Sequence, residues 1–148
     1  MANPIVLIPA GVSELNPSPI PTDWILKGTP DTRNRELAKS ADRTSTVFDW
    51  SCTAGEFVWH YAEDEVLVVV DGETFITDET GVEHRLGPGD MGFFPAGSSC
   101  RWRITGHVRK FAMVKTSLPK PLSFAMRLWR KLRRMVGASP ISPLTRAA

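Results

Sequence analysis

Five residues in the middle of the chain have side chains suited to binding or catalysis: Trp59, Tyr61, Glu65, Cys100 and Trp102. A glutamate such as Glu65 can serve as a general acid, a general base or a metal ligand. A cysteine such as Cys100 can serve as a nucleophile or a soft metal ligand. Trp59 and Tyr61 are two residues apart, as are Cys100 and Trp102, so each pair shares one face if its segment is a β-strand.

Short segments with β-strand character, separated by turns, position these residues. The expected strands are 45–50, 56–61, 65–71, 73–77, 82–86, 90–94, 99–104 and 107–115. Hairpin turns are predicted at Asp71-Gly72, at Thr80-Gly81 and at Gly106, and the polar segment 31–43 is predicted to be a loop. Many short strands with turns at this spacing indicate an all-β sandwich or barrel.

Composition excludes several classes of protein. The 148 residues suffice for one compact domain, and 42% hydrophobic with 23% charged residues is ordinary for a soluble globular protein. No apolar run approaches the roughly 20 residues of a membrane-spanning helix, and the start of the sequence does not resemble a signal peptide. The two cysteines provide no disulfide framework, so a cytoplasmic location is expected.

The segment Gly87–Gly97 has the sequence GPGDMGFFPAG, which predicts a turn, a strand and a second turn. Earlier in the chain, Glu65 and Gly72 form a second motif with the spacing E-x6-G. Further matching features are Trp50-x-Cys52, Gly55, Trp59, Tyr61, Pro95-x-Gly97, Trp102 and Val108-Arg109-Lys110. Together they resemble the cupin subfamily typified by the ureidoglycine aminohydrolase cupin domain. The resemblance covers residues 24–117 and implies an antiparallel double-stranded β-barrel, or jelly roll. Residues 1–23 are then a Pro-rich arm, and a homodimer is expected because cupins often form one.

The resemblance also identifies four metal-ligand positions. Counting from the cupin motifs, the three histidine positions fall on Trp59, Tyr61 and Cys100, and only Glu65 is retained. Indole offers no metal ligand and a neutral phenol is a poor one, so no tightly bound metal and no other cofactor is expected. The alternative is an unconventional divalent-metal site that His84 or His107 completes.

The resemblance implies that the five candidate residues face the barrel interior. They then either line an aromatic pocket, with Glu65 as the polar anchor for a small cationic or planar polar ligand, or simply fill the barrel. Glu65 is the first candidate for a catalytic group, unless it is paired with an inward-facing arginine or lies at a solvated mouth. Cys100 is the second candidate, unless it is a small core residue.

The favoured function is that of a small-molecule-binding cupin with a degenerate metal site. The first alternative is a metal-dependent hydrolase or isomerase related to ureidoglycine aminohydrolase. The second alternative is a regulatory module that its C-terminal helix recruits to an anionic membrane, which would make the protein peripheral to that membrane.

The C-terminal segment differs from the rest of the chain in charge. Residues 1–119 hold 11 Lys and Arg against 16 Asp and Glu, whereas residues 120–148 hold seven Lys and Arg and no acidic residue. Residues 123–136 predict a basic amphipathic helix, followed by a flexible tail over 138–148. Its apolar residues share one arc, and the residues expected to contact a membrane or partner are Arg127, Trp129, Arg130, Lys131, Arg133 and Arg134. The helix packs on the barrel or a partner, or it lies on a membrane. Nucleic acid is not expected as a partner, because the β-rich part is acidic.

Overall fold

The computed structural model describes residues 4–9 and 14–135, which fall into two compact units. The first unit ends at Ser117 and the second begins at Leu118. The second unit contains the helix α1 (Lys120–Met135), which begins three residues before the predicted start. The tail predicted over 138–148 lies outside the described residues. No helix in the described part of the chain is long and apolar enough to span a membrane.

The first unit consists almost entirely of antiparallel strands. In chain order the elements are β1 (Asn16–Pro17), the short 3-10 helix η1 (Thr22–Trp24), β2 (Ile25–Lys27), β3 (Thr32–Lys39), β4 (Ser45–His60), β5 (Asp64–Gly72), β6 (Thr74–Thr77), β7 (Glu83–Leu86), β8 (Met91–Phe94) and β9 (Ser99–Lys115).

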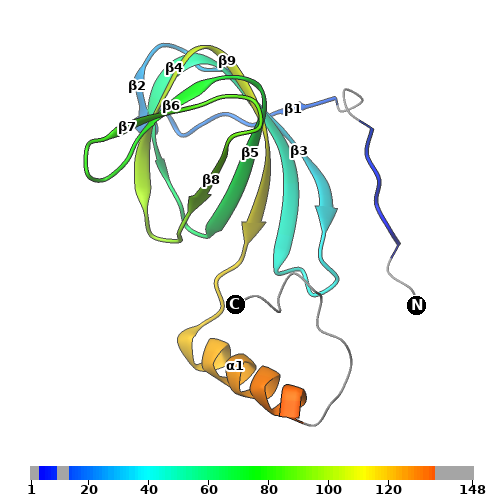
Figure 1. Ribbon diagram of the computed structural model, residues 1–148. Helices are drawn as coiled ribbons and strands as arrows, with labels where there is room; N and C mark the ends of the chain where they lie inside the picture. Colours follow the sequence, from blue (N-terminus) through cyan, green and yellow to red (C-terminus); the bar gives the residue numbers. More distant parts are fainter. Residues whose placement is uncertain (1–3, 10–13, 136–148) are drawn as a thin grey trace. The chain divides into compact units, whose positions relative to one another are not determined.

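Two long strands, β4 and β9, join two facing sheets. They pair antiparallel along their whole length, from Ser45 opposite Lys115 to His60 opposite Ser99 (Figure 1). One half of this pair lies in a sheet of order β1-β3-β4-β9-β5-β8. The other half lies between β2 on one side and β6 and β7 on the other. This arrangement is the predicted antiparallel double-stranded β-barrel, or jelly roll.

A β-bulge separates the two halves of the β4–β9 pair. Thr53 pairs with His107 and Gly55 pairs with Ile104, so β9 carries one residue more than β4 in this interval. The bulge changes which residues of β4 face the interior. The apolar side chains of Trp50 and Cys52 are buried before the bulge, and those of Phe57 and Tyr61 are buried after it.

Three local predictions are wrong. The segment 31–43, predicted as a loop, contains strand β3, which pairs with β4. Gly106, predicted as a turn, lies within β9 at the bulge. Asp71-Gly72 does not form a hairpin, because β5 and β6 both pair with β9 and not with each other. The hairpin at Thr80-Gly81 is confirmed, since β6 pairs antiparallel with β7.

Gly72 has a structural role where the chain passes from β5 to β6. Its φ angle is 70°, and a Cβ atom there would lie 2.0 Å from the carbonyl oxygen of His107. Only glycine fits a backbone with this conformation and this close approach. The Asp-Gly pair therefore marks the passage from one sheet to the other and not a reversal within one sheet.

Candidate functional site

The five residues singled out in the sequence all lie between the two sheets. Tyr61, Glu65, Cys100 and Trp102 are buried, and Trp59 packs half-buried against the same core. β4 supplies Trp59 and presents Tyr61 just beyond its end, β5 supplies Glu65, and the first half of β9 supplies Cys100 and Trp102. The alternation of inward and outward side chains along these strands brings the residues together.

Aromatic rings fill the space around these residues. Trp102 is 1% exposed and stacks on Phe57, with the ring centroids 6.0 Å apart. Trp50 meets Trp102 edge to face at 5.8 Å and Trp59 at 6.0 Å. Ring pairs at these separations are favourable contacts of a packed core. The rings of Trp50, Phe57, Trp59 and Trp102 therefore pack against one another inside the barrel, and a ligand pocket lined by these residues stays a prediction.

Glu65 forms a buried ion pair with Lys110. The lysine ammonium donates a hydrogen bond to Oε1 of Glu65 at 2.5 Å, and the two side chains are 5% and 9% exposed. The ammonium also lies 4.8 Å from the ring centroid of Trp50 and 4.9 Å from that of Trp102. Cation–π attraction adds to the ion pair in this dry environment. The partner of Glu65 is thus a lysine of β9, whereas the sequence analysis considered an arginine.

The thiol and the phenol beside this ion pair are held in their neutral forms. Burial raises the pKa of the Tyr61 hydroxyl and of the Cys100 thiol. The Tyr61 oxygen accepts a hydrogen bond from Nε1 of Trp102 at 3.2 Å, and the Cys100 thiol contacts it at 3.9 Å. Since the thiolate is the nucleophilic form of cysteine, this environment does not activate Cys100. A catalytic role for Cys100 or Glu65 stays a prediction.

The residues at the four cupin metal positions do not fit a metal ion. Trp59 has no ligand atom to offer, Tyr61 and Cys100 are held protonated, and the Glu65 carboxylate already binds an ammonium group. The alternative site with histidines is not assembled either. His84 contacts Asp78 and His107 contacts Asp71, both on the exposed surface. Within residues 4–9 and 14–135 no three His, Cys, Asp or Glu side chains are grouped to hold a metal.

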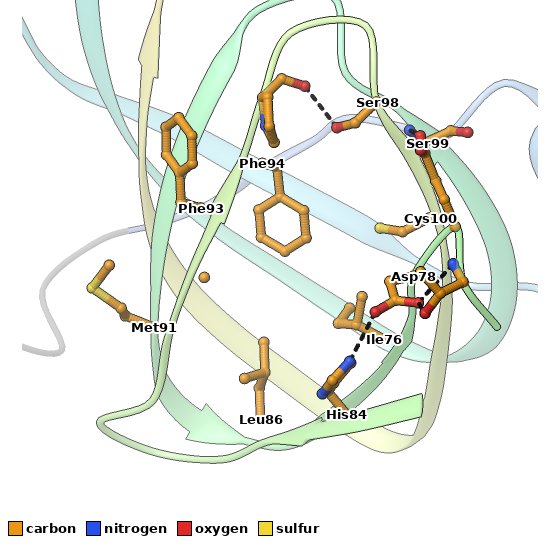
Figure 2. A pocket seen from close by; sticks show the side chains of 14 residues that line it. Ile76, Asp78, His84, Leu86, Met91, Phe93, Phe94, Ser98, Ser99 and Cys100 are labelled. Atoms are coloured by element: carbon orange, nitrogen blue, oxygen red, sulfur yellow. Dashed lines mark hydrogen bonds and ion pairs between the residues drawn. The ribbon is translucent and has the colours of Figure 1, made fainter. Parts of the chain in front are cut away.

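A pocket of about 510 Å³ that is half open to solvent, called the cavity below, lies between β8 and the β6–β7 hairpin. Figure 2 shows Ile76, Leu86, Phe94 and Cys100 around a common space. Phe94 lines the cavity and also stacks on Tyr61 of the interior, with the ring centroids 4.7 Å apart. Cys100 lines the cavity, and so does His84, the candidate of the alternative metal site.

The polar side of the cavity is built around Asp78. One carboxylate oxygen of Asp78 accepts hydrogen bonds from the backbone N–H and the hydroxyl of Thr80, at 2.9 and 2.6 Å. The other oxygen contacts Nε2 of His84 at 3.0 Å. The hydrogen bond from the Thr80 hydroxyl and the contact with His84 hold the pKa of Asp78 well below its usual range. The contact with Asp78 holds the imidazole of His84 at the solvent-exposed edge of the cavity (Figure 2).

Sequence reasoning missed most of this cavity. Ile76, Leu86 and Phe94 lie in segments that were predicted only as strands, and Asp78 was not singled out. His84 was noted as a metal-ligand alternative and not as a cavity residue. The sequence feature that could have indicated the cavity is the pair of turn residues Thr80-Gly81. The hairpin that they form places both Asp78 and His84 at the edge of the barrel.

Comparisons with known proteins identify the family. Residues 39–112, half of the chain, match the family described as the EutQ-like cupin domain. No curated protein matches the sequence.

Similar solved structures include a protein of unknown function from Pseudomonas syringae pv. tomato, with 26% identity and a TM-score of 0.65 over 70% of this chain. This chain spans 45% of the length of that protein. The EutQ protein of Clostridium difficile is similar at 18% identity, with a TM-score of 0.52, over 59% of this chain and 69% of that one. A cupin-like protein of Thermotoga maritima is similar at 15% identity, with a TM-score of 0.56, over 70% of this chain and 80% of that one. The two proteins below 25% identity support the fold alone. From the family match we conclude that the chain belongs to the EutQ-like cupin domain family.

Proposed function

We propose that this cupin binds a small molecule in the cavity between β8 and the β6–β7 hairpin, and not at the metal position of the barrel interior. The observation that carries the proposal is the cavity itself. Its volume of about 510 Å³ falls within the roughly 300–1,000 Å³ typical of ligand pockets. Apolar walls with a few convergent polar groups are also typical of such sites.

The packing of the barrel interior supports the proposal, because buried aromatic rings and a buried ion pair occupy the positions where a cupin would hold its metal. Trp102 and Phe57 are almost fully buried, and Glu65 is neutralised by Lys110. Among the described residues no buried side-chain nitrogen or oxygen lacks a hydrogen-bond partner. A ligand entering the interior would have to displace stacked rings and separate the buried ion pair, whereas the cavity needs neither change.

The lining indicates the chemistry of the ligand. Ile76, Leu86 and Phe94 offer an apolar wall, so the ligand has an apolar or aromatic body. His84 offers a ring nitrogen beside the Asp78 carboxylate, so the ligand carries one polar group that hydrogen-bonds the imidazole.

The test is a thermal-shift screen of a metabolite library with the wild type, Leu86→Trp and Leu86→Met. The larger indole at position 86 projects into the cavity and obstructs it, while methionine keeps the volume of the leucine side chain. A ligand at about 100 times its Kd stabilises the folded state by about 2.7 kcal/mol. We expect wild type and Leu86→Met to respond to the same compound, and Leu86→Trp to lose the response. A library without any hit, or a hit that Leu86→Trp leaves unchanged, contradicts the proposal.

The alternative of a metal-dependent hydrolase or isomerase related to ureidoglycine aminohydrolase stays a prediction. It requires a ligand set that Trp59, Tyr61, Glu65 and Cys100 do not provide. Metal analysis of the purified protein by mass spectrometry, before and after dialysis against divalent ions, decides it. About one metal ion per chain, lost in Glu65→Ala, would favour this alternative over the cavity proposal.

The homodimer also stays a prediction, and the outer face of the β9-β5-β8 sheet supports it. Met91, Phe93, Phe111 and Met113 are between 37% and 61% exposed, and the first two also line the cavity. The strand register places Phe111 and Met91 on either side of Val68. A contiguous apolar surface of this kind typically marks a contact surface, and a second copy of the chain would cover it.

A further inference from the structure

The helix α1 has an apolar surface and a cationic surface and contains no acidic residue. Six large hydrophobic side chains on it are each at least 49% exposed: Leu122, Phe124, Leu128, Trp129, Leu132 and Met135. At 100° per residue, all of these except Leu122 fall within an arc of about 140° around the helix axis. Phe124 lies at one end of this apolar arc and Trp129 at the other. An apolar surface of this size on a 16-residue helix needs a covering partner.

Cations lie along both borders of the apolar arc. On one border Lys131 is about 20° from Phe124 around the helix axis, and on the other Arg133 is about 40° from Trp129. The Arg133 guanidinium lies over the Trp129 ring, 5.0 Å from its centroid. When such an arc is immersed in a lipid interface, the cations at its borders lie at the depth of the headgroup phosphates. The amphipathic Trp129 side chain then lies at the boundary between the headgroups and the acyl chains.

Cations also lie on the side of α1 opposite the apolar arc. Arg127 and Arg130 point to this side by their position on the helical circle. In a helix that packs on a protein surface, these cations face water and contribute little to binding. At an anionic membrane they add to the attraction, because a charged surface acts over about a Debye length of 8–10 Å. The charge pattern therefore fits a lipid surface better than a protein surface.

We propose that α1 lies in the interface of an anionic lipid membrane, with its apolar arc immersed and its cations at the lipid phosphates. The inference is independent of the cavity proposal, because it uses only residues of the second unit. It commits to lipid as the partner. A second copy of the chain and an acidic protein are the competing occupants.

The experiment uses the full chain with vesicles of phosphatidylcholine containing either no phosphatidylserine or about one third phosphatidylserine. Co-sedimentation gives the partition coefficient, and Trp129 emission reports immersion after subtraction of the Trp129→Phe signal. We expect binding to the anionic vesicles and a blue shift of Trp129. Binding weakens strongly as salt rises from about 0.1 M to 1 M, where the Debye length falls to about 3 Å. Equal binding to both vesicle types would overturn the proposal.

Two variants and a matched control assign the binding to α1. Arg130→Gln/Lys131→Gln removes two cations, and at about fivefold per cation it weakens the partition about 25-fold. Leu128→Glu/Leu132→Glu interrupts the apolar arc and abolishes binding. Arg33→Gln/Arg85→Gln removes the same charge from the exposed surface of the β unit and leaves binding nearly unchanged. The proposal fails if the control weakens binding as much as the helix variants do. It also fails if the helix variants change only the oligomeric state measured by light scattering, which would identify a second copy as the partner.

Discussion

Removal of the Lys110 ammonium should expose the energetic role of the buried ion pair. In Lys110→Met the apolar stem is kept, while the charge that neutralises Glu65 is lost. Glu65 is then a buried carboxylate, 9% exposed, with Trp50 and Trp102 around the vacated position and no cation beside it. The double variant Glu65→Leu/Lys110→Met removes both charges and keeps apolar volume at both positions.

The magnitude follows from the burial of both partners. Loss of one partner of a buried ion pair typically costs about 3–5 kcal/mol, because the remaining charge is desolvated without compensation. For a β unit of this size that corresponds to a decrease in Tm on the order of 15–25 °C. Replacement of both partners by apolar groups is often neutral, so the double variant should recover most of the loss.

Urea unfolding followed by circular dichroism at neutral pH measures these effects. A loss below about 1 kcal/mol in Lys110→Met, or a double variant less stable than the single one, would refute the reasoning.

Three further predictions concern other parts of the β unit. Burial raises the pKa of the Cys52 thiol from 9.0 to about 12, so this thiol stabilises the fold fully below pH 9 and loses its contribution as the pH rises toward 12. Urea titrations between these pH values should show that decline, and a Cys52→Ala variant with the same slope would contradict it. Phe111→Lys/Met113→Lys should convert a dimer into a monomer in light scattering, and a monomeric wild type would reject the dimer. Asp49→Asn weakens two hydrogen bonds from Arg109, at 2.9 and 2.6 Å, and should cost about 2 kcal/mol in urea unfolding, whereas no change would show that the pair is dispensable.

The sequence predicted the fold class well because its local signals and its family motifs agree. Residues that alternate along 65–71 and 99–104 form the predicted strands, and the Thr80-Gly81 turn joins β6 and β7. Prediction failed where a strand lacks an apolar pattern. β3 is polar on most positions and exists because it pairs with β4 along seven residue pairs, which local composition does not reveal.

The site was predicted less well, because its state depends on pairings between distant strands. Residue types and motif spacing located the candidate residues in the interior, but the Lys110 partner of Glu65 lies 45 residues away. One signal was present in the sequence. Lys110 alternates with Val108 and Ala112, both buried, so it occupies an inward position of β9. The cavity depends on how the edges of two sheets are spaced, which no local pattern records.

The central claim is that the ligand site is the cavity beside the β6–β7 hairpin and that the barrel interior is closed. Chemical-shift mapping by NMR, with the compound that gives the largest thermal shift, tests it most directly. The account predicts that the perturbed resonances cluster at Ile76, His84, Leu86 and Phe94, and that the Nζ resonance of Lys110 stays unchanged. Perturbations centred on Lys110 and Trp59, or binding that requires a divalent metal, would contradict it.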